Sequence, residues 1–428
     1  MIACLWWLFA WGCGPDVGFP TCAVDDAIPT RDDVPTWQGE IRALTELRCN
    51  GCHGEGGVGP MPFETFEEAA PWAPVIAAVT ADRTMPPWPP VDCCRPLQHP
   101  LALTADEIGA FAAWADGGAP EGDPADYVAP DLPARGLPHV DLTLAMPEAY
   151  TPDPRDGTTD DTRCFLVDWP EDDVRYVTGL GLTPGTPEQV HHALLLVAGP
   201  LAVPSLQLLD RASPGPGWSC PGGVVWGATG WIGGWSPGWE ARQLPAGTGQ
   251  KVAPGSKLVL TVHYSLTDPP GRPDLTTLDL MLADQVQSQL DALSVYDPAW
   301  LVGGMKIPAD DPDVMVSFRT HPHKEKVLVG ANLHMHERGS HGSVGIEHAD
   351  GSRECLLQID RWDHDWQGDY LFEQPVPLAK DDALWVECHW DNTAANQREI
   401  DGVAEAPHDL AWAEDEEMCV AFVSARDP

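Results

Sequence analysis

The sequence predicts a multidomain protein in which a small all-α domain is followed by two antiparallel β-sandwiches. The chain has 428 residues, more than one hydrophobic core usually organises, and its 43% hydrophobic residues are enough for several cores. Helical spacing of apolar residues marks residues 32–122. From about residue 142 the pattern changes to short alternating runs, which Pro and Gly residues interrupt at close intervals.

The N-terminal segment, residues 1–31, is expected to be a signal and linker. An apolar run from Ile2 to Trp11 is followed by Gly12 and Cys13, which resembles a signal segment ending in a lipoprotein-type box. The run is too short to span a bilayer by itself. No Lys or Arg precedes it, so plain export and lipid attachment at Cys13 both stay open. Either way, we expect a periplasmic or extracellular protein.

Three helical stretches are expected within residues 32–122. The first leads into Cys49, and the second runs from about residue 64 to 83 with an interruption at its prolines. The third begins with a capping box from Thr104 to Glu107 and stops at Gly117.

A CxxCH motif, Cys49-Asn50-Gly51-Cys52-His53, follows the first helical stretch. Two cysteines one helical turn apart can form thioethers to both vinyl groups of a haem, and the adjacent His53 then faces the iron. The alternative is a redox or zinc pair followed by an unrelated histidine. Met85, held by the two prolines after it, is the expected sixth ligand, and Met61 is its competitor.

The motif and its surroundings resemble small bacterial cytochrome c domains. The matching pieces are the motif itself, Arg83-Thr84-Met85-Pro86-Pro87-Trp88, the capping box and Trp114-Ala115-Asp116-Gly117-Gly118. The resemblance covers most of residues 40–122. It implies that residues 32–122 form an all-α cytochrome c domain that carries haem c.

Residues 123–158 are rich in Pro and Asp and are expected to form an extended, flexible linker. The formal net charge of the chain is −41, which argues against nucleic acid as a partner.

Three histidine features follow the linker. His191 and His192 are neighbours in an apolar run, so they can serve one metal only on an irregular backbone. His263 lies on the strand expected over residues 257–264, on the face shared by Val259 and Thr261. His334 and His336 alternate, which puts both imidazoles on one face of a strand and is the strongest local metal signal.

The sequence here resembles the copper type II, ascorbate-dependent monooxygenases, which include peptidylglycine α-hydroxylating and dopamine β-monooxygenase. The matching pieces, in family order across residues 160–420, are HHALLL, LVLTVHYS, LHMHERG, ECHWDNTAAN and DEEMC. The resemblance implies two jelly-roll-like sandwiches, residues 159–285 and 286–428, with one copper ion each. It assigns one ion to His191, His192 and His263, and the other to His334, His336 and Met418.

The resemblance also implies two disulfides, Cys164–Cys220 and Cys388–Cys419. Cys22, Cys93 and Cys94 are expected to pair among themselves, and Cys355 has no expected partner.

Some family features are missing. Where peptidylglycine enzymes hold the substrate carboxylate, this sequence has Asn332, Val420 and Phe422, so peptide amidation is not expected. Other histidines, namely His321, His323, His364 and His389, are expected at the surface or in packing.

The resemblance implies a copper-dependent monooxygenase that hydroxylates a small organic substrate with O2 at His334, His336 and Met418. Electrons would come through the haem region, from ascorbate or from a redox partner protein. The alternative is a haem–copper electron-transfer or copper-binding module without hydroxylase activity.

Overall fold

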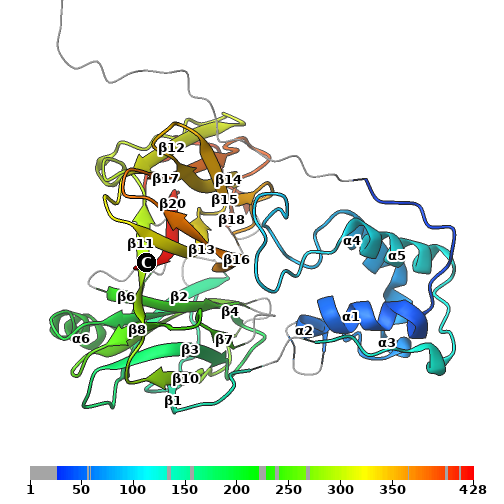
Figure 1. Ribbon diagram of the computed structural model, residues 1–428, viewed down its shortest axis with the longest axis horizontal. Helices are drawn as coiled ribbons and strands as arrows, with labels where there is room; N and C mark the ends of the chain where they lie inside the picture. The colour runs from blue at the N-terminus through cyan, green and yellow to red at the C-terminus, as the bar shows by residue number, and fades with distance from the viewer. Residues whose placement is uncertain are drawn as a thin grey trace, which may run out of the picture.

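A computed structural model describes residues 27–428 except 55–56, 58, 133–135, 155–158, 221–227, 237–240, 267–269, 365, 401–402 and 414–415. Cys13, the expected lipid site, and Cys22 lie outside the described residues. Figure 1 shows a helical part beside two β-rich parts that are stacked on each other. No helix among the described residues is long and apolar enough to cross a membrane.

The helical part is built from short helices around a small aromatic core. Trp37 and Trp114 are almost fully buried there, with ring centroids 6.0 Å apart. The capping box of Thr104 and Glu107 is present, as predicted, and the longest helix ends at Gly117. The elements are η1 Trp37–Ile41, α1 Arg42–Arg48, α2 Asn50–His53, α3 Phe66–Ala69, η2 Ala70–Trp72, α4 Ala73–Ala81, α5 Ala105–Asp116 and η3 Pro124–Asp126.

The expected all-α cytochrome c domain is wrong as a fold class. The protein is mostly β, with 37% of the described residues in strands and 16% in helices, and the helical part is short. The helical part is short because the segment between α4 and α5 contains prolines, which lack the backbone N–H that a helix needs. This extended segment pairs with the β structure through the bridges Pro90–Ile359 and Leu97–Phe372, and Leu97 is buried in the C-terminal β core.

The N-terminal β part packs a five-stranded sheet, in the order β5-β2-β9-β4-β6, against β1, β10, β3 and β8. Apolar residues on alternate positions of these strands, such as Leu195 and Leu260, form its core. Its elements are β1 Leu142–Ala145, β2 Asp160–Asp168, β3 Arg175–Thr183, β4 Val190–Ala198, α6 Val203–Ala212, β5 Trp218–Ser219, β6 Ala228–Trp235, β7 Arg242–Gln243, β8 Thr248–Val252, β9 Lys257–Ser265 and β10 Thr277–Ala283.

The C-terminal β part packs the sheet β12-β17-β14-β15 against β11, β20, β13 and β16. Its core includes Trp390 and Met335, both fully buried. Its elements are β11 Ser288–Val295, η5 Trp300–Val302, β12 Val314–Thr320, β13 Lys326–His334, β14 Gly339–Glu347, β15 Arg353–Ile359, β16 Tyr370–Leu378, β17 Ala383–Trp390, β18 Glu399–Ile400, β19 Val403–Ala404 and β20 Val420–Arg426.

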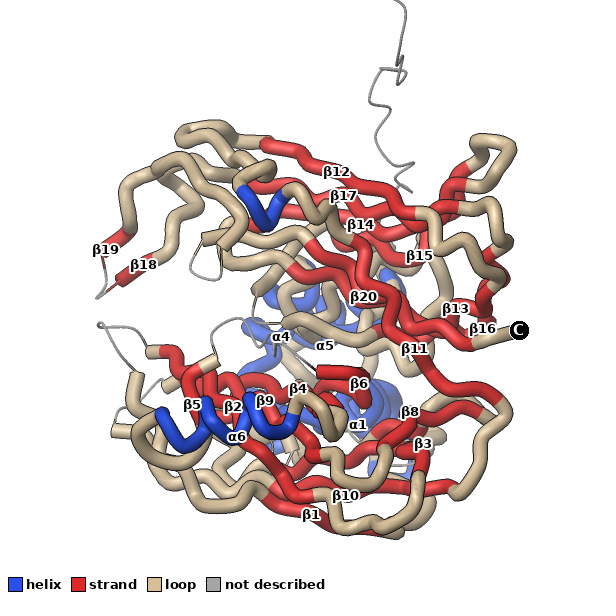
Figure 2. The backbone as a smooth tube through the Cα atoms, turned by 90° about the vertical axis from the view of Figure 1, so that its left-hand side faces the viewer, coloured by secondary structure: helices blue, strands red, loops and turns tan. Residues whose placement is uncertain are grey.

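The two β parts are not separate antiparallel sandwiches. One sheet runs through both of them in the order β1-β10-β3-β8-β11-β20-β13-β16, with β7 attached to β3. The junction is a parallel pairing of β8 with β11, in which Ser288 lies opposite Thr248. Figure 2 shows β11 passing between the two stacks of strands. The backbone hydrogen bonds of this pair therefore help to fix the two halves relative to each other.

The expected flexible linker is partly folded. Within residues 123–158, β1 pairs with β10 along its whole length, and Tyr150 forms a bridge with Asp274. The helical part is also attached directly to the C-terminal β part, because Cys94 forms a disulfide with Cys355 and Arg95 forms an ion pair with Glu354. The helical part is therefore docked, not freely mobile.

Three disulfides are present among the described residues. Cys164–Cys220 and Cys388–Cys419 are the two pairs expected from the sequence. Cys94 pairs with Cys355, for which no partner was expected, instead of with Cys22 or Cys93, and Cys93 is also disulfide-bonded. This number of disulfides is typical of proteins that fold in an oxidising compartment.

Candidate metal centre

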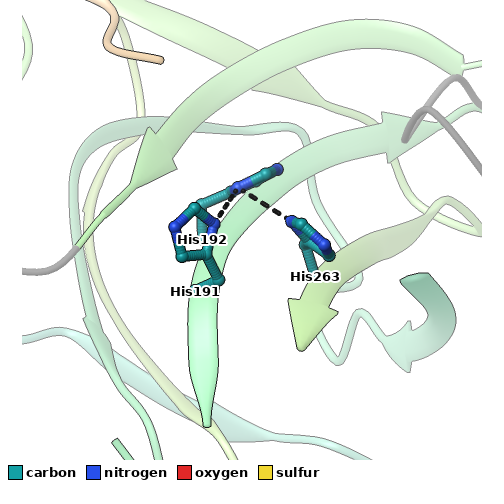
Figure 3. Close-up of side chains that lie close together, drawn as sticks. All are labelled: His191, His192 and His263. Atoms are coloured by element: carbon teal, nitrogen blue, oxygen red, sulfur yellow. Dashed lines mark hydrogen bonds between the residues drawn. The ribbon is translucent and has the colours of Figure 1, made fainter. Parts of the chain in front are cut away.

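The first histidine cluster joins two neighbouring strands. His191 and His192 lie on β4, and His263 lies on β9 (Figure 3). The Nδ1 atom of His192 is 3.2 Å from Nδ1 of His191 and 3.3 Å from Nδ1 of His263. The pairing of β4 with β9 shifts register between Val190 and His192. This irregularity lets the consecutive side chains of His191 and His192 point to one site. The sequence predicts an irregular backbone here for the same reason.

The environment of this cluster suits a metal ion. Burial and the neighbouring histidines lower the pKa of His192 well below 6.5, so its ring is neutral at neutral pH. Asp160 Oδ1 lies 2.9 Å from Nε2 of His263, which orients that ring with Nδ1 toward the other two histidines. Burial opposes ionisation of Asp160, yet its bond with His263 prevails and lowers the pKa to about 2.

The second cluster contains His334, the last residue of β13, and His336 just beyond it. Their ring centroids are 5.1 Å apart. Nδ1 of His334 lies 2.6 Å from Oε1 of Gln367, and Nδ1 of His336 lies 3.3 Å from the carbonyl oxygen of Glu416. These contacts leave the Nε2 atoms for an ion. Within the described part of the chain, Nε2 of His334 is buried without a hydrogen-bond partner.

Burial lowers the pKa of His334 to about 4 and that of His336 well below 6.5. Both rings are therefore neutral at neutral pH, which is the form that binds metals. Met418, 5% exposed, lines the same cavity as the two histidines.

Glu417 is a functional candidate that the sequence did not single out. Its buried carboxylate accepts the backbone N–H of His336 at 3.0 Å, the backbone N–H of Arg338 at 2.8 Å and the indole N–H of Trp390 at 2.8 Å. It thereby ties the segment that carries Met418 to the segment that carries His336. Its place beside Met418 in DEEMC is the only signal for it in the sequence.

Both clusters open into one cavity of about 1220 Å³. His364, expected at the surface or in packing, stands between them. Its ring centroid is 6.3 Å from that of His263 and 6.1 Å from that of His336. His364 belongs to the connection between β15 and β16, which also supplies Gln367 and places Trp366 6.3 Å from His191. A continuous row of rings therefore links the two clusters.

Three further residues line this cavity, namely Asn332, Val420 and Phe422, which stand where peptidylglycine enzymes hold the substrate carboxylate. Asn332 donates its amide N–H to the carbonyl oxygen of Gly368 at 2.6 Å, so its side chain is engaged by the protein itself. Phe422 on β20 stacks against Trp231 on β6, with centroids 6.1 Å apart and planes 9° from parallel. The two rings come from opposite β parts and give the cavity an aromatic wall.

The CxxCH motif lies at α2 (Figure 1), and Arg48, just before it, forms an ion pair with Glu107 in the first turn of α5. Nδ1 of His53 is 2.9 Å from the carbonyl oxygen of Met61, and the ring stacks on Phe63 at 4.6 Å. Nε2 of His53 is therefore the nitrogen left for a ligand. Cys49 and Cys52 are free thiols, and burial raises their pKa values to about 12 and about 11. Met85 lies in the loop after α4 and is 39% exposed.

No family model matches the sequence, and no curated protein matches it. Among solved structures, the chain is similar to a two-domain protein of unknown function from Bacteroides fragilis, with 12% identity, 65% of this chain and 94% of that chain covered, and a TM-score of 0.15. It is also similar to the VP2 subviral particle of infectious bursal disease virus, with 9% identity, coverages of 67% and 72%, and a TM-score of 0.18. Such low TM-scores carry no argument about fold or function.

Proposed function

We propose that the protein is a copper-dependent monooxygenase that hydroxylates a small organic substrate with O2. The observation that carries the proposal is the convergence of two histidine clusters on one cavity, in which burial lowers the pKa of His192, His334 and His336. Three imidazoles suit a copper ion that stores an electron, and two imidazoles with the thioether of Met418 favour Cu(I). Copper at the two sites would supply one-electron transfer and activation of oxygen.

The chain's own residues would hold the ligands in position. Asp160 orients His263, and Gln367 orients His334 through its Nδ1 atom. Glu417 fixes the backbone at His336 next to Met418. Such contacts behind the ligands fix ring orientation and reduce the reorganisation that metal binding requires.

The cavity walls indicate the substrate class. Trp231 and Phe422 offer flat apolar surfaces, and the family's arginine is replaced by Asn332, whose amide is already bonded to Gly368. A small aromatic or aliphatic compound suits these walls better than a peptide with a free carboxylate.

We propose haem c at Cys49, Cys52 and His53, with Met85 as the sixth ligand, as the electron source, supplemented or replaced by ascorbate or a redox partner. Two free thiols and an imidazole with Nδ1 already engaged are what covalent attachment and iron ligation need. Arg361 donates to the carbonyl oxygen of Asp82 in the helical part, and Trp362 donates its indole N–H to the carbonyl oxygen of His336 at 2.9 Å. This short connection favours electron entry at the His334–His336 site.

One observation favours the alternative, a haem–copper electron-transfer or copper-binding module. His364 occupies the space between the clusters, where a substrate would approach both ions. Under either function, we propose that the protein is located in the periplasm or outside the cell, with Cys13 as the lipid attachment site.

The test measures oxygen uptake by the copper-loaded protein with a reductant across a library of small compounds. His334→Ala should abolish substrate-dependent uptake, whereas His139→Ala, which changes an exposed histidine that is not among the residues lining the cavity, should retain it. Copper binding without substrate-dependent uptake in the wild type would favour the electron-transfer module.

A further inference from the structure

A third group of metal-ligating side chains lies outside the cavity, on the outer face of the sheet β12-β17-β14-β15. It consists of Asp313, His341 and His389, whose ligand atoms all lie within 4.8 Å of one another. The same limit holds for His191, His192 and His263. We propose that these three residues form a separate site for a divalent transition-metal ion such as Zn²⁺. The inference does not depend on the proposed monooxygenase activity.

The backbone brings the two histidines together by a β-bulge. Gly339 lies opposite Trp390, and the next pair is His341 with His389, so Ser340 is an extra residue in β14. An unbroken register would put His341 opposite Cys388, which is fully buried on the core face. With the bulge, both imidazoles lie on the outer face, with ring centroids 3.9 Å apart. Bulges commonly redirect a side chain at functional sites.

The bulge is held by neighbouring residues. The backbone N–H of Trp362 donates to the carbonyl oxygen of Ser340 at 2.8 Å, and the Ser340 hydroxyl lies 3.1 Å from Nδ1 of His341. Nδ1 of His341 is thus engaged by its neighbour, which leaves Nε2 as the nitrogen for an ion. The geometry of His341 is therefore built by the sheet and does not depend on a mobile surface loop.

Carboxylates surround the second imidazole. Oδ1 of Asp313 lies 2.8 Å from Nδ1 of His389, and Oε1 of Glu387 lies 3.2 Å from its Nε2. Glu387 and His389 alternate on β17, so they share this outer face. Two imidazoles and one or two carboxylates give nitrogen and oxygen ligands, which suit Zn²⁺. The cavity site with Met418 instead offers a thioether, which favours Cu(I). A chain of net charge −41 also concentrates divalent cations near its surface.

An ion here would connect three adjacent strands. Asp313 immediately precedes β12, His389 lies on β17 and His341 on β14. His389 follows Cys388, whose disulfide partner Cys419 follows Met418. A bound ion would therefore brace the sheet behind the thioether of the cavity site. To reach zinc–ligand bond lengths of about 2 Å, the ligand atoms of the three side chains would move closer together by about 1 Å.

The test counts zinc in full-length protein whose cavity sites are disabled by His263→Ala and His336→Ala. After incubation with Zn²⁺ and desalting, we expect one zinc ion per chain by elemental analysis. Adding His341→Ala and Asp313→Asn should remove that ion. Adding His321→Ala and His323→Ala instead should not, because that pair of stacked surface rings, 5.7 Å apart, belongs to no three-ligand group among the described residues. Equal loss in both variants, or no loss in the first, would overturn the proposal.

A second measurement covers the case in which the cavity variants do not fold. In the otherwise wild-type chain, Zn²⁺ should raise the melting temperature less in His341→Ala than in His321→Ala/His323→Ala. An identical zinc-induced shift in the two variants would contradict the site. Failure of copper to bind in the cavity would leave both results unchanged, so the two proposals fail separately.

Discussion

The carboxylate of Glu417 accepts the backbone N–H of His336 at 3.0 Å, although the two residues are 81 positions apart in the chain. Because Met418 follows Glu417 directly, this bond ties the segment that carries the thioether to the segment that carries the imidazole, and both residues line the same cavity. The same carboxylate accepts two further N–H groups, so one buried side chain holds three donors.

Replacing Glu417 should therefore destabilise the fold. Glu417→Ala leaves three buried donors without their acceptor, which we expect to lower the free energy of unfolding by about 3 kcal/mol or more. Glu417→Gln keeps one acceptor oxygen and should cost less. Urea denaturation measures both, with the exposed Glu148→Gln as control. Equal stabilities of Glu417→Ala and Glu148→Gln would refute the clamping role.

Protonation of the two imidazoles should have little effect on copper binding at the second cluster between about pH 5 and pH 8. Burial lowers the pKa of His334 to about 4 and that of His336 well below 6.5, so neither ring needs to release a proton in that range. Copper retention in His263→Ala protein, dialysed at a series of pH values, measures this. Loss of the ion as the pH falls through about 6.5, the pKa of an ordinary imidazole, would contradict the burial of these rings.

The row of rings through His364 predicts that two bound Cu(II) ions interact magnetically. The electron paramagnetic resonance spectrum of the doubly loaded protein should show dipolar broadening and a half-field transition. Both features should vanish in His192→Ala protein, which keeps only the second cluster. A wild-type spectrum equal to the sum of two isolated ions would show that the clusters lie farther apart in solution.

The haem proposal predicts a difference between two methionines. The carbonyl oxygen of Met61 is bonded to His53, which places its backbone on the side of the proximal ring. Met61→Ala should therefore keep a low-spin absorption spectrum, whereas Met85→Ala should become high-spin. Cys52→Ser should lose most of the covalent haem. A high-spin Met61→Ala protein with a low-spin Met85→Ala protein would reverse the ligand assignment.

The disulfide Cys94–Cys355 should keep the helical part attached to the C-terminal β part. In the double variant Cys94→Ser/Cys355→Ser, limited proteolysis should release a helical fragment much faster than from the wild type. The matched control replaces Cys164 and Cys220, whose disulfide lies within the N-terminal β part. Equal release from the two variants would mean that noncovalent contacts alone hold the helical part.

The features that follow local patterns could be predicted from the sequence. Alternation indicated that His334 and His336 share a face, the capping box located α5, and the need for an irregular backbone at His191 and His192 is met by a register shift. Long-range pairings could not be predicted. The docking of Pro90 against Ile359 depends on an edge strand that no local pattern reveals.

The same limit applies to the site. The neighbours of His364 and Glu417 come close only in the folded chain, so the sequence predicted a surface or packing residue at His364 and did not single out Glu417. The continuous sheet was missed because β8 and β11 pair in parallel, whereas short alternating strands without helical crossovers favour antiparallel neighbours.

The proposed function requires that this cavity insert one oxygen atom into a C–H bond. The most direct measurement incubates copper-loaded protein, a reductant and the compound that gives the greatest oxygen uptake under ¹⁸O2, followed by mass spectrometry of the product. We predict an alcohol that carries a single ¹⁸O atom, formed by wild-type protein and absent with His334→Ala. Oxygen consumption that yields only hydrogen peroxide or water, with no ¹⁸O in any organic product, would contradict the monooxygenase function.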